Sequence, residues 1–298
     1  MPPVEINVDA LYNALIDEIA KALNVPRTKG VMSMLHALFG RAARRFVELS
    51  AQLDRMVAQS GSAAAARWAL QYFVKGHTAR GAENIPDQGP LVIAANHPAS
   101  VDSLVISAYV ERPDYKIIIG DIPFFQNLPN LSRHAIFAAH PRHLHKRMLV
   151  IRESIRHLQH GGALLIFPRG GIEADPEFMS DADSEFNRWS RSLEIFLKHV
   201  PQTQVLVTMV SGVIHPKAMK HPLTWFRRAR PDRQRLAFIY QMMRQILSGR
   251  ELFGLMPRVT FGELLEGPSA CSLVAVHAAA QRTLAHHMSW KAEIRNDS

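Results

Sequence analysis

The sequence predicts an α/β fold in which helices cover a sheet and a small helical bundle precedes it. Apolar residues recur every three or four positions up to about residue 75, which is the period of amphipathic helices. Turn residues become frequent after Gly76, and short apolar runs then alternate with helical patterns. We therefore divide the chain into an N-terminal helical bundle at residues 1–75 and an α/β domain at residues 76–298.

The N-terminal part is expected to contain three or four amphipathic helices. The first covers residues 11–23, where leucine or isoleucine occupies every fourth position. A second apolar pattern runs over residues 31–56, and we expect Gly40 to divide it. Gly61 marks a turn before a helix over residues 63–73. We expect the apolar stripes to pack together as a bundle, with docking on a membrane as the alternative.

The second part alternates strands with helices. Apolar runs predict strands over residues 90–95, 115–119, 135–139, 163–167 and 204–214, and a last strand that begins at residue 259. Helical patterns follow Asp102 and cover residues 145–159, 185–199 and 270–290. This alternation predicts a sheet with helices packed against it.

The charge balance predicts an anionic partner. The chain carries 35 Lys and Arg against 26 Asp and Glu, a formal net charge of +9, which suits nucleic acid, anionic lipid or a phosphorylated substrate. No nucleic-acid-binding motif is visible, so we expect no nucleic acid partner. The sequence shows neither a signal peptide nor an uncharged apolar run of about 18 residues, and we expect a cytoplasmic protein, peripheral on the inner face of a membrane.

The stretch NHPASVD, from Asn96 to Asp102, lies between a predicted strand and a helical pattern, which is a common place for a site. His97 and Asp102 can form a base and the carboxylate that orients it. On a continuous helix, positions five apart would lie about 140° from one another, so the chain must turn between them. We expect Ser100 to cap the helix that follows and Asp102 to lie in its first turn.

The order of motifs around this stretch resembles the glycerolipid acyltransferase family, which includes glycerol-3-phosphate and lysophosphatidate acyltransferases. The family's first motif, NHxxxxD, matches Asn96, His97 and Asp102, and GGALLIFPRGG lies at its third motif. The resemblance implies a mixed sheet covered by helices and an O-acyltransferase, with His97 as general base and Asp102 holding its ring. It also implies acyl-CoA or acyl carrier protein as donor, and a hydroxyl of a glycerol phosphate or lysophospholipid as acceptor.

The third motif departs from the family's Phe-Pro-Glu-Gly-Thr-Arg. Arg169 stands where the family has the glutamate, and the threonine and arginine are missing. Arg169 either supplies the displaced positive charge to a phosphate or signals a different acceptor. Glu173 and Asp175 are the two candidates to replace the lost carboxylate.

The second motif of the family carries an arginine after a short apolar strand, and Arg142 is the candidate, with Arg133 and Arg147 as alternatives. The resemblance and the loop positions together give these substrate-binding candidates: Asn96, Ser100, Arg142, Phe167, Pro168, Arg169, Gly170 and Gly171. We expect no cofactor beyond the acyl-CoA or acyl carrier protein co-substrate. We expect no metal either, because the histidines around residue 140 fit no zinc spacing.

Residues 215–235 mix cations with Trp225 and Phe226, which suits an anionic membrane surface or an ordinary exposed basic loop. Two further functions remain open from the sequence. A catalytically weak scaffold that binds lipid or acyl carrier protein is favoured by the loss of the third-motif glutamate, whereas the intact His97–Asp102 pair argues against it. An acyl thioester hydrolase would need the same base.

Overall fold

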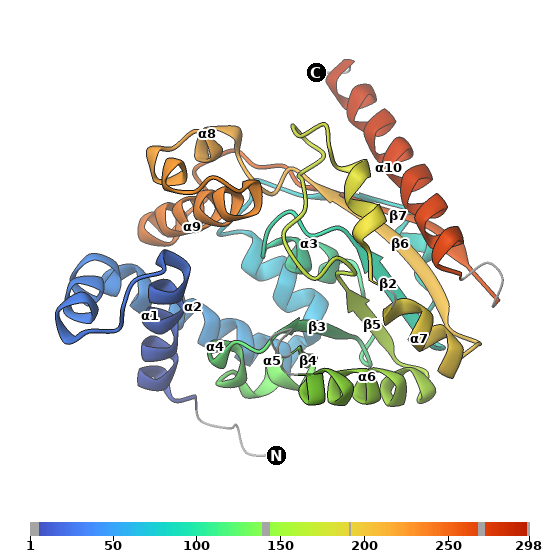
Figure 1. Ribbon diagram of the computed structural model, residues 1–298, viewed down its shortest axis with the longest axis horizontal. Coiled ribbons are helices and arrows are strands. Elements are labelled where there is room, and N and C mark those ends of the chain that lie inside the picture. The colour runs from blue at the N-terminus through green and yellow to red at the C-terminus, as the bar shows by residue number, and fades with distance from the viewer. Residues whose placement is uncertain (1–5, 139–143, 191, 268–271, 297–298) are drawn as a thin grey trace.

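The computed structural model describes residues 6–138, 144–190, 192–267 and 272–296. Within these ranges it shows a seven-stranded mixed sheet with helices on both faces, which confirms the predicted fold class (Figure 1). In sheet order the strands are β1 (Thr78–Arg80), β7 (Arg258–Leu265), β6 (Gln204–Ser211), β2 (Leu91–Ala95), β5 (Ala163–Ile166), β3 (Lys116–Gly120) and β4 (Ala135–Ala138). Neighbouring strands run parallel except β6 and β7, which are antiparallel.

Alternate residues of the central strand β2 face two different hydrophobic layers. Leu91, Ile93 and Ala95 pack in one layer with α2 (Lys29–Leu70), α3 (Asp102–Ser107) and α9 (Arg230–Ser248). Val92 and Ala94 pack in the other with α6 (Leu144–Gln159), α7 (Ser192–His199) and α10 (Leu273–Asn296). Because both faces are covered, the strand is apolar throughout, and this is why the sequence revealed it.

Short helical segments connect the larger elements. They are η1 (Ala82–Asn84), α4 (Pro123–Gln126), α5 (Pro129–Arg133), η2 (Asp183–Arg188), α8 (Pro216–Met219) and η3 (Pro222–Phe226), where η denotes a 3₁₀ helix. Among the described residues, none of the helices combines the length and the apolar character needed to cross a bilayer.

The N-terminal helices are α1 (Val8–Leu23) and α2, which pack against each other. The expected division of α2 at Gly40 is wrong, because the helix is continuous there. A Cβ at Gly40 would lie 2.9 Å from the Tyr12 hydroxyl of α1, so the glycine permits the close approach of the two helices. The turn predicted at Gly61 is confirmed: its φ of 81° and ψ of 169° are not helical, and α2 kinks at this residue.

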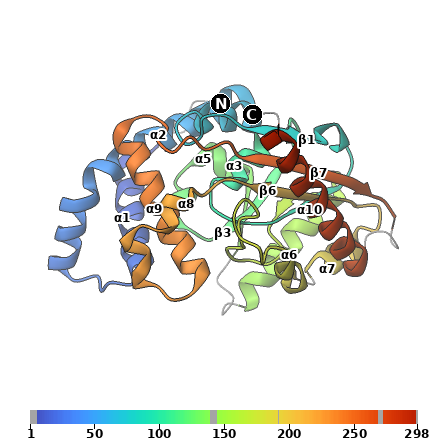
Figure 2. The same cartoon turned by 90° about the horizontal axis from the view of Figure 1, so that it is seen from above.

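The second half of α2 reaches the sheet and contacts α3, α5 and α9. Asp54, which is fully buried, accepts hydrogen bonds from the backbone N–H groups of Asn130 and Leu131 at the start of α5. Figure 2 shows α1 with α9 at one end of the molecule, whereas α10 and α7 lie at the other.

Two predicted segments differ from the structure. The helix expected over residues 185–199 is divided into η2 and α7, with an extended backbone at Trp189 between them. Residues 215–235 form α8, η3 and the beginning of α9 rather than a loop. Pro231 near the start of α9 fits this boundary, since proline is well tolerated in the first helical turn.

Candidate active site

His97 and Asp102 lie at the carboxyl end of β2, the central strand of the sheet. Parallel strands place their following loops at a common edge, so the segment after β5, which begins at Phe167, reaches the same place. The loop after β6 begins at Gly212, and β6 is also parallel to β2. The site is therefore built where three neighbouring strands end.

The chain turns after His97 and brings its ring back onto Asp102. The Nδ1 atom of His97 lies 2.9 Å from Oδ2 and 3.1 Å from Oδ1 of Asp102. Asp102 is fully buried, and its Oδ2 also accepts the backbone N–H of Ala99 at 3.0 Å. The carboxylate is thus fixed by the turn itself and holds the imidazole in one orientation.

The N-terminal cap of α3 is not the residue that the sequence predicted. Val101 rather than Ser100 precedes the first residue of α3, without a side-chain capping bond, and Asp102 is that first residue. Ser100 is exposed and its carbonyl accepts the hydroxyl of Ser103. Asp102 makes the capping-type bond backward to Ala99, which explains why a serine cap is not needed.

The His97 ring is stacked on Phe167, with 4.2 Å between centroids and 25° between planes. The side chain of His97 is 22% exposed, so one part of the ring reaches the surface while the part facing Asp102 is covered. Within the described chain the ring uses Nδ1 for Asp102, which leaves Nε2 for a substrate.

Opposing influences set the pKa of His97. Burial lowers it most, but the charge and hydrogen bond of Asp102, together with the charge of Glu173, raise it, and Arg235 opposes them. The balance places the pKa of His97 above its ordinary value of 6.5. The imidazolium form is therefore stabilised in this site, as a base that accepts a proton during a reaction requires.

Glu173 is buried, and both its side chain and its backbone are hydrogen-bonded to the backbone of His97. Its Oε2 accepts the N–H of His97 at 2.8 Å, and its own N–H donates to the His97 carbonyl at 2.8 Å. Its Oε1 accepts the indole N–H of Trp189 at 2.8 Å. Burial raises the pKa of Glu173 to about 7, against these hydrogen bonds, which lower it.

Asp175, the other candidate to replace the lost glutamate, has a different place. Its carboxylate accepts the backbone N–H groups of Gly212 and Val213 after β6, at 2.9 and 3.1 Å. It is fully buried and fixes the loop that follows this strand. Of the two carboxylates, Glu173 is the one that contacts His97.

Asn96 holds the loop that begins at His97 to strand β6 of the sheet. Its side-chain oxygen accepts the Val210 N–H at 2.8 Å and its amide nitrogen donates to the Val210 carbonyl at 2.9 Å. With 2% exposure and both amide atoms bonded to β6, Asn96 fixes the position of His97 and presents no surface to a substrate. Its predicted place among the substrate-binding residues is corrected accordingly.

The third-motif residues form a turn beside His97. Pro168 is buried and its carbonyl accepts the N–H of Ser190, while the Gly170 N–H donates to the carbonyl of Phe167. Gly170 has a φ of 69°, the left-handed region that suits glycine. Gly171 follows in the turn, and a Cβ there would lie 2.9 Å from a guanidinium nitrogen of Arg169.

Arg169 is held by a carboxylate. Its Nε donates to Glu185 at 2.6 Å, and Glu185, only 3% exposed, is also bonded by Arg230 of α9. The guanidinium of Arg169 is therefore held within the protein by a carboxylate that it shares with Arg230. Arg142, the candidate for the second motif, lies outside the described residues.

Sequence reasoning missed the contribution of α9. Gln234 is fully buried, and its amide donates to the carbonyls of Glu173 at 2.7 Å and Pro98 at 3.3 Å. Arg235, the next residue, acts on His97 through its charge. The available signal in the sequence was a pair of glutamines seven residues apart, Gln234 and Gln241. The structure shows that both side chains are buried.

Comparisons with known proteins found a family model and similar solved structures. The family model described as Acyltransferase matches residues 77–188, which contain the His97–Asp102 pair and Phe167. The crystal structure of the 1-acyl-sn-glycerophosphate (LPA) acyltransferase PlsC from Thermotoga maritima is similar at 17% identity and a TM-score of 0.45, with 94% of each chain covered. No curated protein matches the chain. Residues 77–188 are therefore similar to the acyltransferase family.

Proposed function

We propose that the protein transfers a fatty acyl group from acyl-CoA or acyl carrier protein to a hydroxyl of a glycerol phosphate or lysophospholipid acceptor. The single observation that supports this most is the buried Asp102 carboxylate 2.9 Å from a partly exposed His97 ring. A protein that only binds lipid has no use for a base oriented in this way. The match of residues 77–188 to the Acyltransferase family model supports this reaction class, and the net charge of +9 suits phosphorylated substrates.

Nε2 of His97 takes the proton of the acceptor hydroxyl while its oxygen attacks the thioester carbonyl carbon. Asp102 stabilises the imidazolium that forms and keeps the proton of Nδ1 in place. The tetrahedral intermediate then breaks its carbon–sulfur bond, and the proton on Nε2 passes to the departing thiolate. The products are an ester and a free thiol, and no protein nucleophile takes part.

The carbonyl oxygen of the thioester gains negative charge during the attack and needs hydrogen-bond donors. Because the Gly170 N–H is used within its own turn, Gly171 is the amide we assign to this task. Phe167, stacked on His97, supplies an apolar wall that suits an acyl thioester.

We also propose that the protein works as a peripheral protein at an anionic membrane on the cytoplasmic side. The 3₁₀ helix η3 presents Trp225 and Phe226 at 70% and 81% exposure. Lys217 and Lys220 precede them in and after α8. Exposed aromatic residues beside cations suit a bilayer interface with anionic headgroups, where the aromatic rings lie at the boundary.

The test is thiol release from a long-chain acyl-CoA, measured with and without candidate alcohols. We expect release that depends on glycerol 3-phosphate or a lysophospholipid, and we expect His97→Ala to abolish it with the fold intact by circular dichroism. Release without alcohol would identify a hydrolase. No release from acyl-CoA or acylated carrier protein would identify a scaffold.

A further inference from the structure

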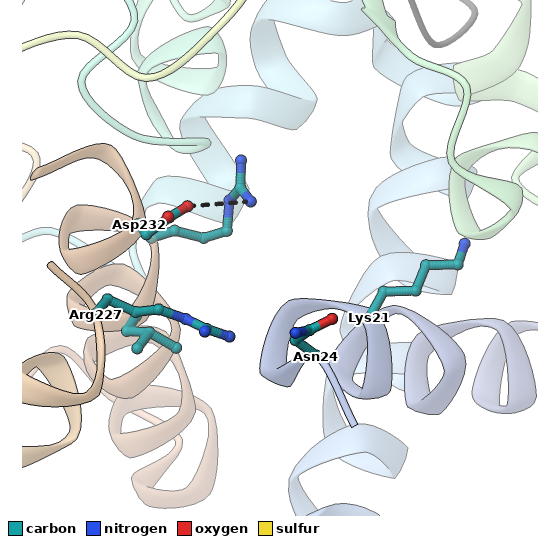
Figure 3. Close-up of a pocket in the computed structure, with 6 residues that line it drawn as sticks. Lys21, Asn24, Arg227 and Asp232 are labelled. Atoms are coloured by element: carbon teal, nitrogen blue, oxygen red, sulfur yellow. Dashed lines mark ion pairs between the residues drawn. The ribbon is translucent and has the colours of Figure 1, made fainter. Parts of the chain in front are cut away.

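A pocket lies between the end of α1 and the beginning of α9. Its lining residues are Lys21, Asn24, Arg227, Asp232, Arg235 and Leu236, and its volume is ≈ 280 Å³. Figure 3 shows Arg227 extending toward Asn24, so that residues far apart in the sequence face each other across the space. The volume is at the small end of the roughly 300–1,000 Å³ typical of ligand sites. It suits a compact group rather than a whole lipid.

The lining is cationic and almost entirely polar. Among the lining residues, Lys21, Arg227 and Arg235 are cations and Asp232, 4.0 Å from Arg235, is an anion. Lys21 also forms an ion pair with Glu18 of its own helix. Leu236 is the one apolar member of this lining set. Such a lining disfavours an acyl chain and favours an anion that accepts several hydrogen bonds, which arginine forks provide.

The pocket adjoins the catalytic loop through α9. Gln234 bonds to the carbonyls of Pro98 and Glu173, on either side of His97 in the site. Arg235, the next residue of the helix, lines the pocket and lies close enough for its charge to act on His97. Arg235 thus belongs both to the pocket lining and to the helix whose Gln234 holds the loop of His97.

Arg169, the cation of the third motif, is poorly placed to bind such an anion. Arg169 is 16% exposed at its side chain and donates to the buried Glu185. Arg227 and Arg235 instead reach a solvent-accessible recess. The α1–α9 pocket therefore offers a substrate phosphate two guanidinium groups, whereas Arg169 is held by Glu185.

We propose that this pocket binds the phosphate group of a substrate, and so positions that substrate for His97. This inference rests on the proposed acyl transfer. Both possible sources, a phosphorylated acceptor and the phosphates of acyl-CoA, present the same chemistry. The residues that bind it are Arg227 and Arg235, and Lys21 adds charge at the rim.

The experiment compares the wild type with Arg227→Gln, Arg235→Gln and the double variant. Arg244→Gln, exposed on the same helix and outside the pocket, is the matched control. KM is measured separately for glycerol 3-phosphate, a lysophospholipid and acyl-CoA. In parallel, the rise in Tm caused by inorganic phosphate is measured at constant ionic strength, because this readout needs no turnover.

We expect the double variant to raise KM for one phosphorylated substrate by about tenfold or more and to lose the Tm rise with phosphate. A rise limited to the acceptor assigns the pocket to the acceptor phosphate, and a rise limited to acyl-CoA assigns it to the donor. Unchanged KM values with an unchanged Tm response overturn the proposal, even when acyl transfer is observed. A lost Tm response in a protein without transferase activity supports the pocket and refutes the proposed function.

Discussion

Replacing Asp102 with asparagine tests whether the carboxylate acts through its charge on His97. Asparagine keeps the volume, and its oxygen can still accept the Ala99 N–H at the position of Oδ2. Its amide nitrogen then occupies the position of Oδ1, 3.1 Å from Nδ1 of His97. The oxygen at the position of Oδ2, 2.9 Å from Nδ1, can still accept the ring N–H. The neutral amide, however, no longer stabilises the imidazolium by its charge, and its N–H₂ group disfavours a proton on Nδ1.

The expected cost follows from these two losses. General-base catalysis typically contributes about 10²–10⁴-fold, which corresponds to about 2.7–5.4 kcal/mol at about 1.36 kcal/mol per tenfold change. Asp102 raises the pKa of His97 through its charge and hydrogen bond, so the acid limb of the pH–activity profile should lie at lower pH in the variant than in the wild type. In the wild type this limb should lie above pH 6.5, the ordinary pKa of histidine.

The assay is steady-state thiol release at saturating acceptor, repeated from acidic to alkaline pH. Asp54→Asn is the matched control, because Asp54 is also fully buried and accepts backbone N–H groups, but on α2 and α5. We expect it to lower stability by about 1–3 kcal/mol and to leave the pH profile unchanged. An Asp102→Asn enzyme that keeps more than about a tenth of the wild-type kcat with the same acid limb would refute the reasoning.

Three other predictions concern an ion pair, an exposed aromatic pair and a buried carboxyl group. Arg169→Ala removes the ion pair with the buried Glu185 and should lower the free energy of unfolding in urea by about 1–3 kcal/mol. Arg188 is 69% exposed and lies 4.0 Å from Glu185, so Arg188→Ala should change this free energy by less than about 1 kcal/mol. Trp225→Ala with Phe226→Ala should reduce sedimentation with anionic vesicles, and equal sedimentation of both proteins would contradict the membrane proposal. Burial raises the pKa of Glu173 from its ordinary value of 4.5 to about 7, so the folded state holds this proton more tightly than the unfolded state does. Stability should therefore decline as pH rises from about 4.5 through about 7, and Glu173→Gln should flatten that decline in pH-dependent denaturation.

The sequence was most informative where one physical signal dominated. The runs at residues 90–95 and 163–167 are buried on both faces, so their apolar character alone located β2 and β5. The His97–Asp102 contact was predictable because the pair lies between an apolar run and a helical pattern, where the chain has to turn. The structure shows that contact at 2.9 Å.

The helix α9 was missed because three of its six buried residues are glutamines. Gln234, Gln241 and Gln245 are all buried, and each side chain donates to a backbone carbonyl of another segment. Hydrophobic periodicity cannot detect a face of this kind, and the surrounding arginines gave the segment the composition of a loop. The strand β1, only three residues long, is below the length at which a pattern is visible.

The altered third motif gains a physical explanation from Glu173. The substitution at Arg169 removes a carboxylate from the turn, but Glu173, four residues later, returns one to the site and attaches it to the His97 backbone at 2.8 Å. Because Gln234 holds the Glu173 carbonyl, this carboxylate is also tied to α9, the helix that carries Arg235 into the pocket. A displacement of α9 would therefore be transmitted to the backbone of the base through two hydrogen bonds. His97, Glu173 and Arg235 are thus connected through the hydrogen bonds of Glu173 and Gln234, the neighbour of Arg235 on α9.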